Sequence, residues 1–479
     1  MPTTRRIRID QDQDSTLRAG IAQIKREFKL PLEFPPEVEA AAVKAAANPR
    51  LPTPDRTDIA LITIDPAESM DLDQAMFVER NGAGYRVYYA IADVAAFVTP
   101  GDPIDLEANR RGETLYGAAD KIPLHPKVLS EDAASLLPNQ VRPALLWAIE
   151  LDATGEGISV DVRRARVKSR AKLDYVGVQA SIDAGTADPM WAVLREIGEK
   201  RAQREQRRGG VNLPLPEQEV SFINGQWTLA YRTRYPVEDW NEQISLLTGM
   251  AAAHLMVDAK IGLLRTLPQP DPSAIGRLRR TATALEIDWP SAQSYPDFIR
   301  SLDPAQSRHV AMMIACTSVL RGAGYAAFNG EVPEQPMHWA LASEYAHATA
   351  PLRRLVDRYA GEVCVALCAG QPVPEWVITA LPGLPATMQQ ADRRASRFEH
   401  AVVDLTEALT LAPRVGELFD GSIVELTANN PEQGVVMVRD PAIEAQIAGS
   451  APLPLGASVQ VKLLEANPAT RVTRFEIAS

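Results

Sequence analysis

Along this 479-residue chain the apolar residues are spaced first as in helices, then as in strands, then again as in helices and finally as in strands. This order of elements limits the folds that the chain can adopt. Residues 15–28 and 36–47 have helical spacing, and the second segment begins with proline and acids. The proline-rich stretch at 49–59 then predicts an extended linker. After it, residues 74–80 and 85–98 have the β-branched and aromatic content of strands, joined by the turn NGAG.

Helical spacing returns from roughly residue 190 and dominates the middle of the chain. Short strands separated by Gly, Asn and Pro turns fill the last stretch, 415–479, and indicate a small closed barrel for which the OB fold is the obvious candidate. The chain is therefore predicted to be α+β. We expect a small helical N-terminal module at 1–55, a mixed sheet with helices at 56–412, and an OB-fold barrel at 413–479.

The charge and the cysteine content limit the kinds of partner and the cellular compartment that we expect. A formal net charge of −11 argues against non-specific binding of nucleic acid, but such a protein can still bind RNA if arginines line an interior channel and the acids lie on the outer surface. The three cysteines cannot form a disulfide framework, and Cys364 and Cys368 have no second pair or clustered histidines to complete a zinc site. No signal peptide is visible at the N-terminus, and no apolar run is long enough to span a bilayer. We therefore expect a cytoplasmic protein with no membrane partner.

The segment ITIDPAESMDLDQAMF carries the strongest candidate site. Asp71 and Asp73 stand two apart in an extended segment, so they face the same side, and the preceding loop can return that side towards Asp65. Hard cations such as Mg²⁺ prefer such oxygen ligands. On spacing alone, aspartates that form turns by bonding their own backbone are the commoner explanation.

Three blocks of sequence, in the same order as in a known family, favour the metal site over the turn. DPAESMDLDQA resembles the motif of the RNase II (RNB) family, in which an aspartate is followed by three more in the order Asp, any residue, Asp, Asp. The block that begins YYAIADVAAFVTPGD is similar to the family's next block. Far downstream, HWALASEYAHATAPLRRLVDRYA and RRASRFEHAVVD resemble its Thr-Ser-Pro-Ile-Arg-Arg stretch and its arginine-rich helix. The resemblance covers roughly residues 55 to 410.

The resemblance implies an RNB catalytic domain whose sheet and helices surround an RNA channel. It implies a 3′-to-5′ exoribonuclease that hydrolyses single-stranded RNA to nucleoside 5′-monophosphates, by metal-assisted attack of water on the terminal phosphodiester. The expected cofactor is Mg²⁺, as one or two ions, with Mn²⁺ as a substitute. The expected partner is single-stranded RNA, and the expected oligomeric state is a monomer.

The resemblance also assigns the metal ligands. Asp65, Asp71 and Asp73 would bind Mg²⁺, and Asp73, which matches the family's third aspartate, would be the most critical carboxylate. The family's fourth aspartate is Gln74 here. Its neutral carbonyl could hold a metal more weakly, a water or another acid could fill in, or Gln74 could simply face the core. This departure leaves the number of metal ions open.

Other site residues follow from the same blocks. Arg353 matches the arginine that neutralises the phosphate, Glu399 matches the helix glutamate near the RNA 3′ end, and Tyr116 matches the aromatic that stacks on the terminal base. Arg354 and Arg358, a helical turn apart, are candidate contacts to the RNA backbone, although a solvated helix face is the commoner role of such a pair.

Several features depart from the family. Ala350 replaces the serine of Thr-Ser-Pro-Ile and leaves Pro351 as a helix start, and no aromatic ring appears in VNLPLPEQEV, where a second stacking residue is expected. About 55 helical residues precede the catalytic domain in place of two cold-shock barrels. Phe419 and Phe475, the only aromatics of the predicted barrel, could both be core residues.

Two alternatives stay open. One is an RNA chaperone or regulator, inactive because of Gln74, and the other is a metal phosphodiesterase that acts on another polymer. The retained Asp65, Asp71, Asp73 and Arg353 argue against the first, and the downstream blocks argue against the second.

Overall fold

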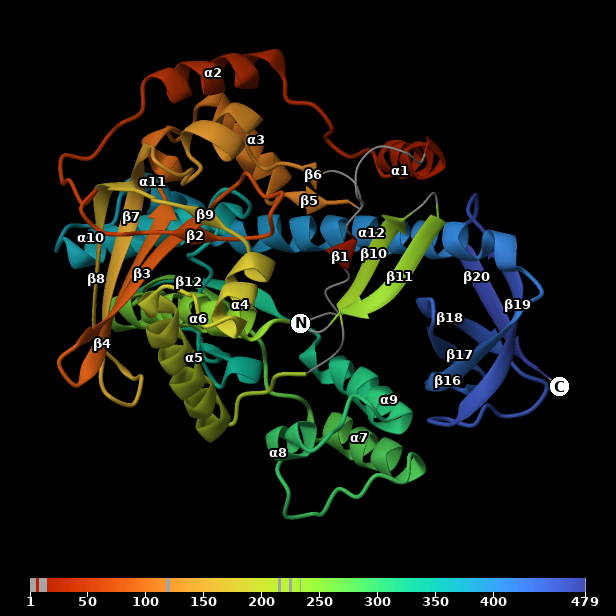
Figure 1. Ribbon diagram of the computed structural model, residues 1–479. Coiled ribbons are helices and arrows are strands. Elements are labelled where there is room, and N and C mark those ends of the chain that lie inside the picture. The colour runs from red at the N-terminus through yellow and green to blue at the C-terminus, as the bar shows by residue number, and fades with distance from the viewer. Residues whose placement is uncertain are drawn as a thin grey trace.

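The computed structural model describes residues 6–7, 15–117, 121–213, 217–223, 226–232 and 234–478. Its first structural unit is a four-stranded antiparallel sheet of order β3-β4-β7-β8 (Figure 1). Gly84 must be a glycine because a Cβ there would lie 2.0 Å from the carbonyl oxygen of Leu151 on the neighbouring strand. The bounds are β3 (Gln74–Asn81), β4 (Gly84–Ala92), β7 (Val141–Leu151) and β8 (Gly157–Lys168).

Both faces of this sheet are buried, because alternate side chains of each strand point to opposite sides. On one face, Tyr89 and Trp147 join a core formed with α4 (Tyr175–Asp183), α5 (Pro189–Arg208), α6 (Pro236–Ala259) and α10 (Leu355–Cys368). On the other face, Ala90 and Leu146 pack against α2 (Pro36–Ala47) and α3 (Pro103–Arg111), which lie across the top of Figure 1.

Short two-stranded pairs surround this sheet and position its loops. Two of them, β2 with β9 and β5 with β6, carry or adjoin residues of the site described below, and the others are β12 with β13 and β14 with β15. A further small sheet has the order β1-β10-β11. Their bounds are β1 (Arg6–Ile7), β2 (Thr63–Ile64), β5 (Leu115–Tyr116), β6 (Lys121–Ile122), β9 (Lys172–Leu173), β10 (Glu217–Ile223), β11 (Gln226–Arg232), β12 (Ile261–Thr266), β13 (Gly324–Asn329), β14 (Met337–His338) and β15 (Ser343–Glu344).

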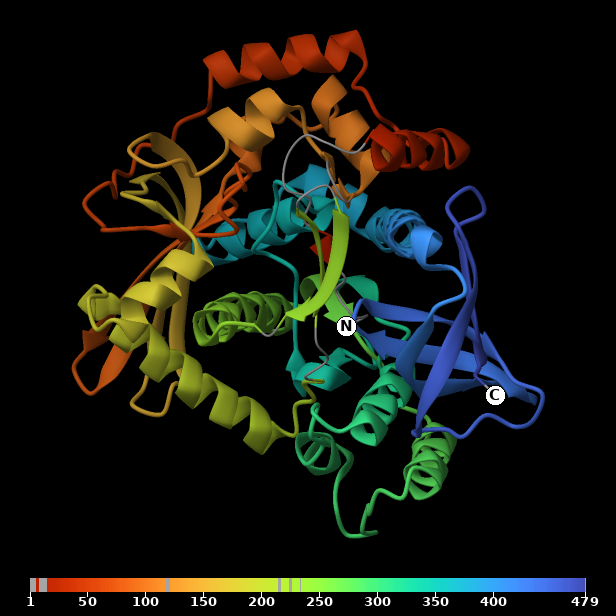
Figure 2. The same cartoon turned by 45° about the vertical axis from the view of Figure 1, so that its right-hand side comes forward.

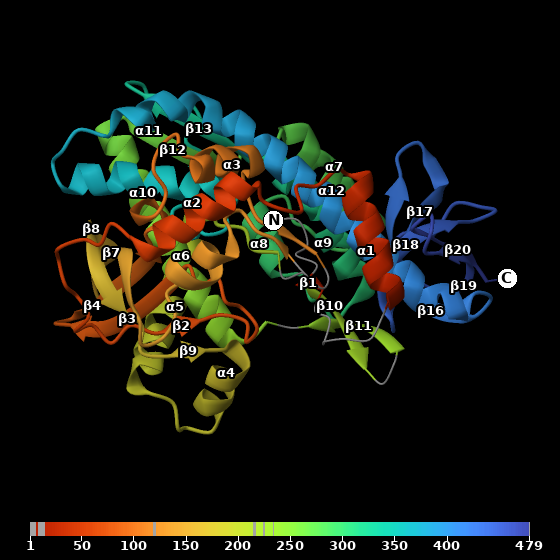
Figure 3. The ribbon, with the colours of Figure 1, turned by 90° about the horizontal axis from the view of Figure 1, so that it is seen from above.

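The longest helix, α12 (Leu384–Leu411), runs from the sheet half of the molecule to the C-terminal barrel. Helix α1 (Ser15–Glu27) lies against it, as Figure 3 shows from above, and buries Leu17 and Ile24 against Phe398. A smaller helical group completes the lower side in Figure 2. It consists of α7 (Pro272–Ala284), α8 (Tyr295–Arg300) and α9 (Ser307–Cys316), while α11 (Glu375–Ala380) links α10 to α12.

The C-terminal strands form a closed barrel of order β16-β17-β18-β20-β19, which confirms the predicted OB-type barrel. Phe419 and Phe475 are both buried and meet edge to face with ring centroids 5.7 Å apart, so they are core residues. The strands are β16 (Leu418–Thr427), β17 (Asn430–Arg439), β18 (Ala442–Ala448), β19 (Ser458–Asn467) and β20 (Val472–Ile477).

The two predicted N-terminal helices form at the expected positions, but they bury their apolar faces in different places. Helix α1 packs on α12, whereas α2 packs beside the main sheet. Residues 1–5 and 8–14 of the expected 1–55 module lie outside the described residues, so the module's limits stay a prediction. Among the helices that the structure describes, none is long and apolar enough to cross a membrane.

Candidate active site

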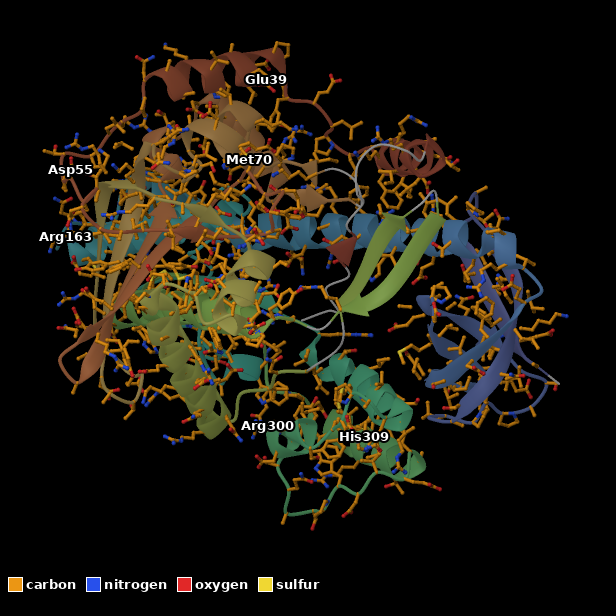
Figure 4. The ribbon with its side chains drawn as sticks, in the orientation of Figure 1. Glu39, Asp55, Met70, Arg163, Arg300 and His309 are labelled. Atoms are coloured by element: carbon orange, nitrogen blue, oxygen red, sulfur yellow. The ribbon has the colours of Figure 1, made fainter. Side chains whose placement is uncertain are left out.

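The three motif aspartates lie where the chain enters the main sheet. Asp65 follows β2, and its backbone N–H donates to the carbonyl of Leu173 on β9 at 3.1 Å. Asp71 and Asp73 immediately precede β3, and Leu72 between them is fully buried, as the alternation of an extended segment requires. Met70, labelled in Figure 4, lies in the loop between Asp65 and Asp71.

Asp73 joins the motif to a turn almost three hundred residues away. Its Oδ1 accepts a hydrogen bond from the backbone N–H of Leu352 at 2.7 Å, and its Oδ2 lies 3.3 Å from Nε of Arg353. The Asp73 side chain is 6% exposed, whereas that of Arg353 is 45% exposed. A buried carboxylate thus holds an arginine whose side chain is still partly exposed to solvent.

The turn that carries Arg353 corrects one expectation. Pro351 does not begin a helix, because α10 starts at Leu355. The N–H of Ala350 donates to Oδ1 of Asp357 at 2.7 Å, and the N–H of Arg354 donates to the carbonyl of Ala350 at 2.9 Å. These bonds hold residues 350–354 as a turn that presents the Leu352 N–H and the Arg353 side chain to Asp73.

Burial opposes the ionisation of two motif carboxylates. Desolvation raises the pKa of Asp65 to about 7, with Arg353 acting in the opposite direction and Asp71 adding to the increase. Desolvation likewise raises the pKa of Asp73 to about 8, against the lowering effects of Arg353 and the Leu352 N–H. Both carboxylates therefore lie where a further positive charge would stabilise their ionised form.

Asp71 has a cationic partner that the sequence did not reveal. Nζ of Lys121 lies 2.6 Å from Oδ1 of Asp71 and 3.1 Å from Oε1 of Glu131. Lys121 is fixed on β6, opposite Tyr116 on β5. No local pattern marks Lys121 or Glu131 as site residues.

Gln74 has both ends of its amide engaged by protein groups. Its Nε2 donates to the carbonyl of Thr349 at 2.6 Å, and its Oε1 accepts from the Tyr89 hydroxyl at 2.7 Å. Ser245 and Thr349 hydroxyls lie 3.0 Å apart beside this pair. Gln74 thus ties the first residue of β3 to the turn that carries Arg353, and its role as a metal ligand stays a prediction.

Tyr116 lies close to Arg353. Thr114, two residues before Tyr116, donates its N–H to the carbonyl of Arg353 at 2.9 Å, which aligns the two segments. Desolvation raises the pKa of the Tyr116 hydroxyl, and Arg353, Asp71 and Asp73 all act on it electrostatically. Tyr116 is nevertheless 42% exposed, so its ring is accessible from outside.

The structure does not bring the other two arginines to this surface. Arg354 forms a two-point ion pair with Asp357 at 2.9 Å. The Arg358 side chain is 2% exposed and lies 2.6 Å from Asp105. The solvated-face alternative is therefore wrong for both, because each guanidinium is paired inside the protein. Their contacts to RNA stay a prediction.

Glu399 lies on α12 and acts electrostatically on a second acidic group, Glu113. Desolvation raises its pKa, and Glu399 in turn contributes to the raised pKa of Glu113, which desolvation brings to about 7. Asp392 and Arg354 also act on Glu113. His347 is partly buried, and its Nδ1 lies 2.7 Å from the Tyr325 hydroxyl.

The donor atoms suit a hard cation that keeps few protein ligands. Across the described ranges, no three His, Cys, Asp or Glu side chains are gathered in a way that could hold a metal ion. Mg²⁺, however, is usually held by one or two carboxylates, with waters and substrate phosphate completing its shell. The two desolvated carboxylates Asp65 and Asp73 fit that chemistry. Asp71 pairs with Lys121, and its role as a metal ligand stays a prediction.

Comparison with known proteins agrees with this geometry. Residues 54–366 match the family model described as the RNB domain, and residues 417–478 match the model described as the RNase II-type exonuclease C-terminal S1 domain. The chain is 28% identical to Ribonuclease R of Escherichia coli (strain K12) over 402 residues, which cover 78% of this chain and 48% of the relative. The chain thus spans about half the length of such relatives.

Other similar proteins are matched over a larger share of their own length. The chain is 26% identical to Exoribonuclease 2 of Serratia proteamaculans (strain 568), over 91% of this chain and 72% of the relative. The structure of Mycoplasma genitalium RNase R in complex with ribose methylated single-stranded RNA superposes with a TM-score of 0.86, at 19% identity, over 97% of this chain and 78% of that one. Yeast Ssd1, a pseudonuclease, superposes with a TM-score of 0.69 at 16% identity, over 94% of this chain and 57% of that one. These superpositions confirm the mixed α+β fold with its C-terminal barrel.

Proposed function

Because the chain belongs to the RNB domain family, we propose that it is a 3′-to-5′ exoribonuclease that hydrolyses single-stranded RNA to nucleoside 5′-monophosphates. One observation carries the proposal: a partly exposed arginine and a partly exposed aromatic ring lie beside buried carboxylates. The Asp73 side chain is 6% exposed, whereas the Arg353 side chain is 45% exposed and Tyr116 is 42% exposed. A phosphodiester and its terminal base need this pair of surface groups.

Arg353 acts on the phosphate of the scissile bond. As water attacks phosphorus, negative charge grows on the phosphoryl oxygens, and a guanidinium fixed by Asp73 stabilises it without having to reorganise. The planar fork of arginine can grip two oxygens at once, which a lysine cannot do.

Asp73 and Asp65 are the carboxylates that would hold Mg²⁺. When bound there, the ion would supply Lewis-acid stabilisation of the phosphoryl group and lower the pKa of an attacking water. Asp73 also fixes the Leu352 N–H and the Arg353 side chain, so a change at Asp73 disturbs the cation site and the phosphate site together.

Tyr116 provides the surface for the 3′-terminal base. Stacking on an aromatic ring contributes about 1–3 kcal/mol per base and tolerates any base, which suits a non-specific exonuclease. Choice of RNA over DNA would rest on contacts to the 2′-hydroxyl. We propose that the protein acts as a cytoplasmic monomer.

A second candidate function is RNA binding without cleavage. Gln74 favours it, because a neutral amide bonded to Tyr89 and Thr349 stands where the family motif has an aspartate. Under this alternative the protein would be an RNA chaperone or regulator.

One assay separates the two candidates. A 5′-labelled single-stranded RNA is incubated with the protein in Mg²⁺ or in EDTA, beside a DNA of the same sequence. A Mg²⁺-dependent ladder that shortens from the 3′ end supports the nuclease, and intact RNA retained in a gel shift supports the binding protein.

Two aspartate variants make the assay specific to the site. Asp73→Asn should abolish the ladder and retain RNA binding. Asp58→Asn, a control on an aspartate whose side chain is 71% exposed, should leave the ladder unchanged. Equal loss in both variants would exclude Asp73 as a catalytic residue.

A further inference from the structure

Each motif aspartate has a lysine or arginine beside it. Nζ of Lys121 lies 2.6 Å from Asp71, and Nε of Arg353 lies 3.3 Å from Asp73. Lys172 lies on β9 opposite Thr63 of β2 and acts electrostatically on Asp65, and its Nζ donates to the carbonyl of Ala67, two residues after Asp65, at 2.7 Å. The site therefore contains positive charge before any metal ion enters.

These charges nearly balance. Four carboxylates and three cations give the site a net charge of −1 when all are ionised; they are Asp65, Asp71, Asp73, Glu131, Lys121, Lys172 and Arg353. One divalent cation brings the net charge to +1, which a single phosphodiester neutralises. Two divalent cations would bring it to +3 in a partly buried site, where unbalanced charge is unfavourable.

Lys121 is held as a metal ion would be. Its ammonium group lies between the carboxylates of Asp71 and Glu131, at 2.6 Å and 3.1 Å, and its side chain is only 20% exposed. The β5–β6 pair fixes its backbone opposite Tyr116. A lysine ammonium is a compact point charge, so it can stand in for a cation at an oxygen-lined position.

Gln74 further reduces the negative charge that metal ions must neutralise at this site. Both of its amide ends bond to protein groups, and it carries no charge. Compared with an aspartate, Gln74 removes one negative charge, and compared with an uncharged residue, Lys121 adds one positive charge. Together the two side chains make the site more positive by two charges. This is the charge of one divalent cation.

We propose that Lys121 is a built-in cation that takes the place of a second metal ion, so that this site binds one divalent cation per chain. The inference rests on the proposed function, because it concerns the cation that the nuclease would use. Lys121 is a positioning residue: it neutralises Asp71 and Glu131, and it leaves Asp65 and Asp73 to the metal ion.

The test counts bound metal ions and does not depend on RNA cleavage. The full-length protein is titrated with Mn²⁺, and free Mn²⁺ is measured by electron paramagnetic resonance. The wild type should bind one Mn²⁺ per chain at the site, as judged by the loss of that binding in Asp73→Asn. Zero or two ions per chain would overturn the proposal, and this count needs no Lys121 variant.

Lysine variants test the cause. Lys121→Met removes the charge and should let a second Mn²⁺ bind, or tighten the first by about tenfold or more. Lys121→Arg keeps the charge and should bind as the wild type does. Lys127→Met is the matched control, because Lys127 lies 4.0 Å from the same Glu131 but its side chain is 69% exposed. Unchanged Mn²⁺ binding in a folded Lys121→Met protein would refute the role of Lys121.

The RNA ladder distinguishes a failure of this inference from a failure of the proposed function. A Mg²⁺-dependent ladder together with two bound Mn²⁺ ions would remove the one-ion inference and leave the nuclease. An absent ladder together with one bound ion would remove the nuclease and leave the charge argument.

Discussion

Replacing Asp73 by asparagine should stabilise the metal-free protein while it abolishes activity. Burial raises the pKa of Asp73 to about 8, roughly four pH units above that of a free aspartate, and each unit corresponds to about 1.4 kcal/mol. At pH 8 the native carboxyl therefore costs up to about 5 kcal/mol of stability, which a neutral asparagine avoids.

Part of this gain is lost, since Arg353 would lose its partner. Its side chain is 45% exposed and returns to water, so that loss is small. The asparagine Oδ1 can still accept the Leu352 N–H. The pKa of about 8 already includes the opposing effects of Arg353 and the Leu352 N–H. We therefore expect a net increase in unfolding free energy of several kcal/mol, at most about 5 kcal/mol, at pH 8.

The gain should depend on pH in a defined direction. A carboxyl whose pKa is raised by folding binds its proton more tightly in the native state than in the unfolded state. Between about pH 4 and pH 8 the stability of the wild type therefore falls as pH rises, through this group. Asparagine carries no such proton, so its advantage should be near zero at pH 4 and largest at pH 8.

Urea unfolding in EDTA at both pH values measures this difference. Asp105→Asn is the matched control, because Asp105 is also buried but pairs with the buried Arg358 at 2.6 Å. Breaking that pair should lower stability by about 3 kcal/mol or more. If Asp73→Asn were destabilised like the control, or had the same effect at both pH values, the argument from desolvation would be wrong.

Three further predictions concern neighbouring residues. Arg353→Lys keeps the charge but loses the planar fork, so kcat should fall by about 100-fold with a smaller change in KM; an unchanged kcat would contradict phosphate stabilisation. Tyr116→Ala should weaken single-stranded RNA binding by about 10- to 100-fold in fluorescence anisotropy, whereas Tyr116→Phe should not; equal losses would mean that the ring does not stack. Gln74→Leu removes the hydrogen bonds to the Tyr89 hydroxyl and the Thr349 carbonyl and should lower the unfolding free energy by about 1–3 kcal/mol; a neutral result in urea unfolding would show that these bonds contribute little.

The sequence by itself determined the elements and the faces that they bury. Helical spacing predicted α1 and α2 to within a residue, the NGAG turn predicted the β3–β4 hairpin, and the short C-terminal strands predicted the closed barrel. The same alternation predicted that Asp71 and Asp73 share one side of the segment, with Leu72, which is buried, on the other. These features follow from residues within one or two turns of each other, so a local pattern carries them.

Only the tertiary structure decided which charges meet. Leu352 and Arg353 reach Asp73 across 279 and 280 positions of sequence, and Gln74 reaches Thr349 across 275. The pairing of Lys121 with Asp71 likewise depends on how β6 is brought beside the motif. The physical reason is that Coulomb and hydrogen-bond energies depend on distance in space, which the folded chain sets and which sequence spacing does not record.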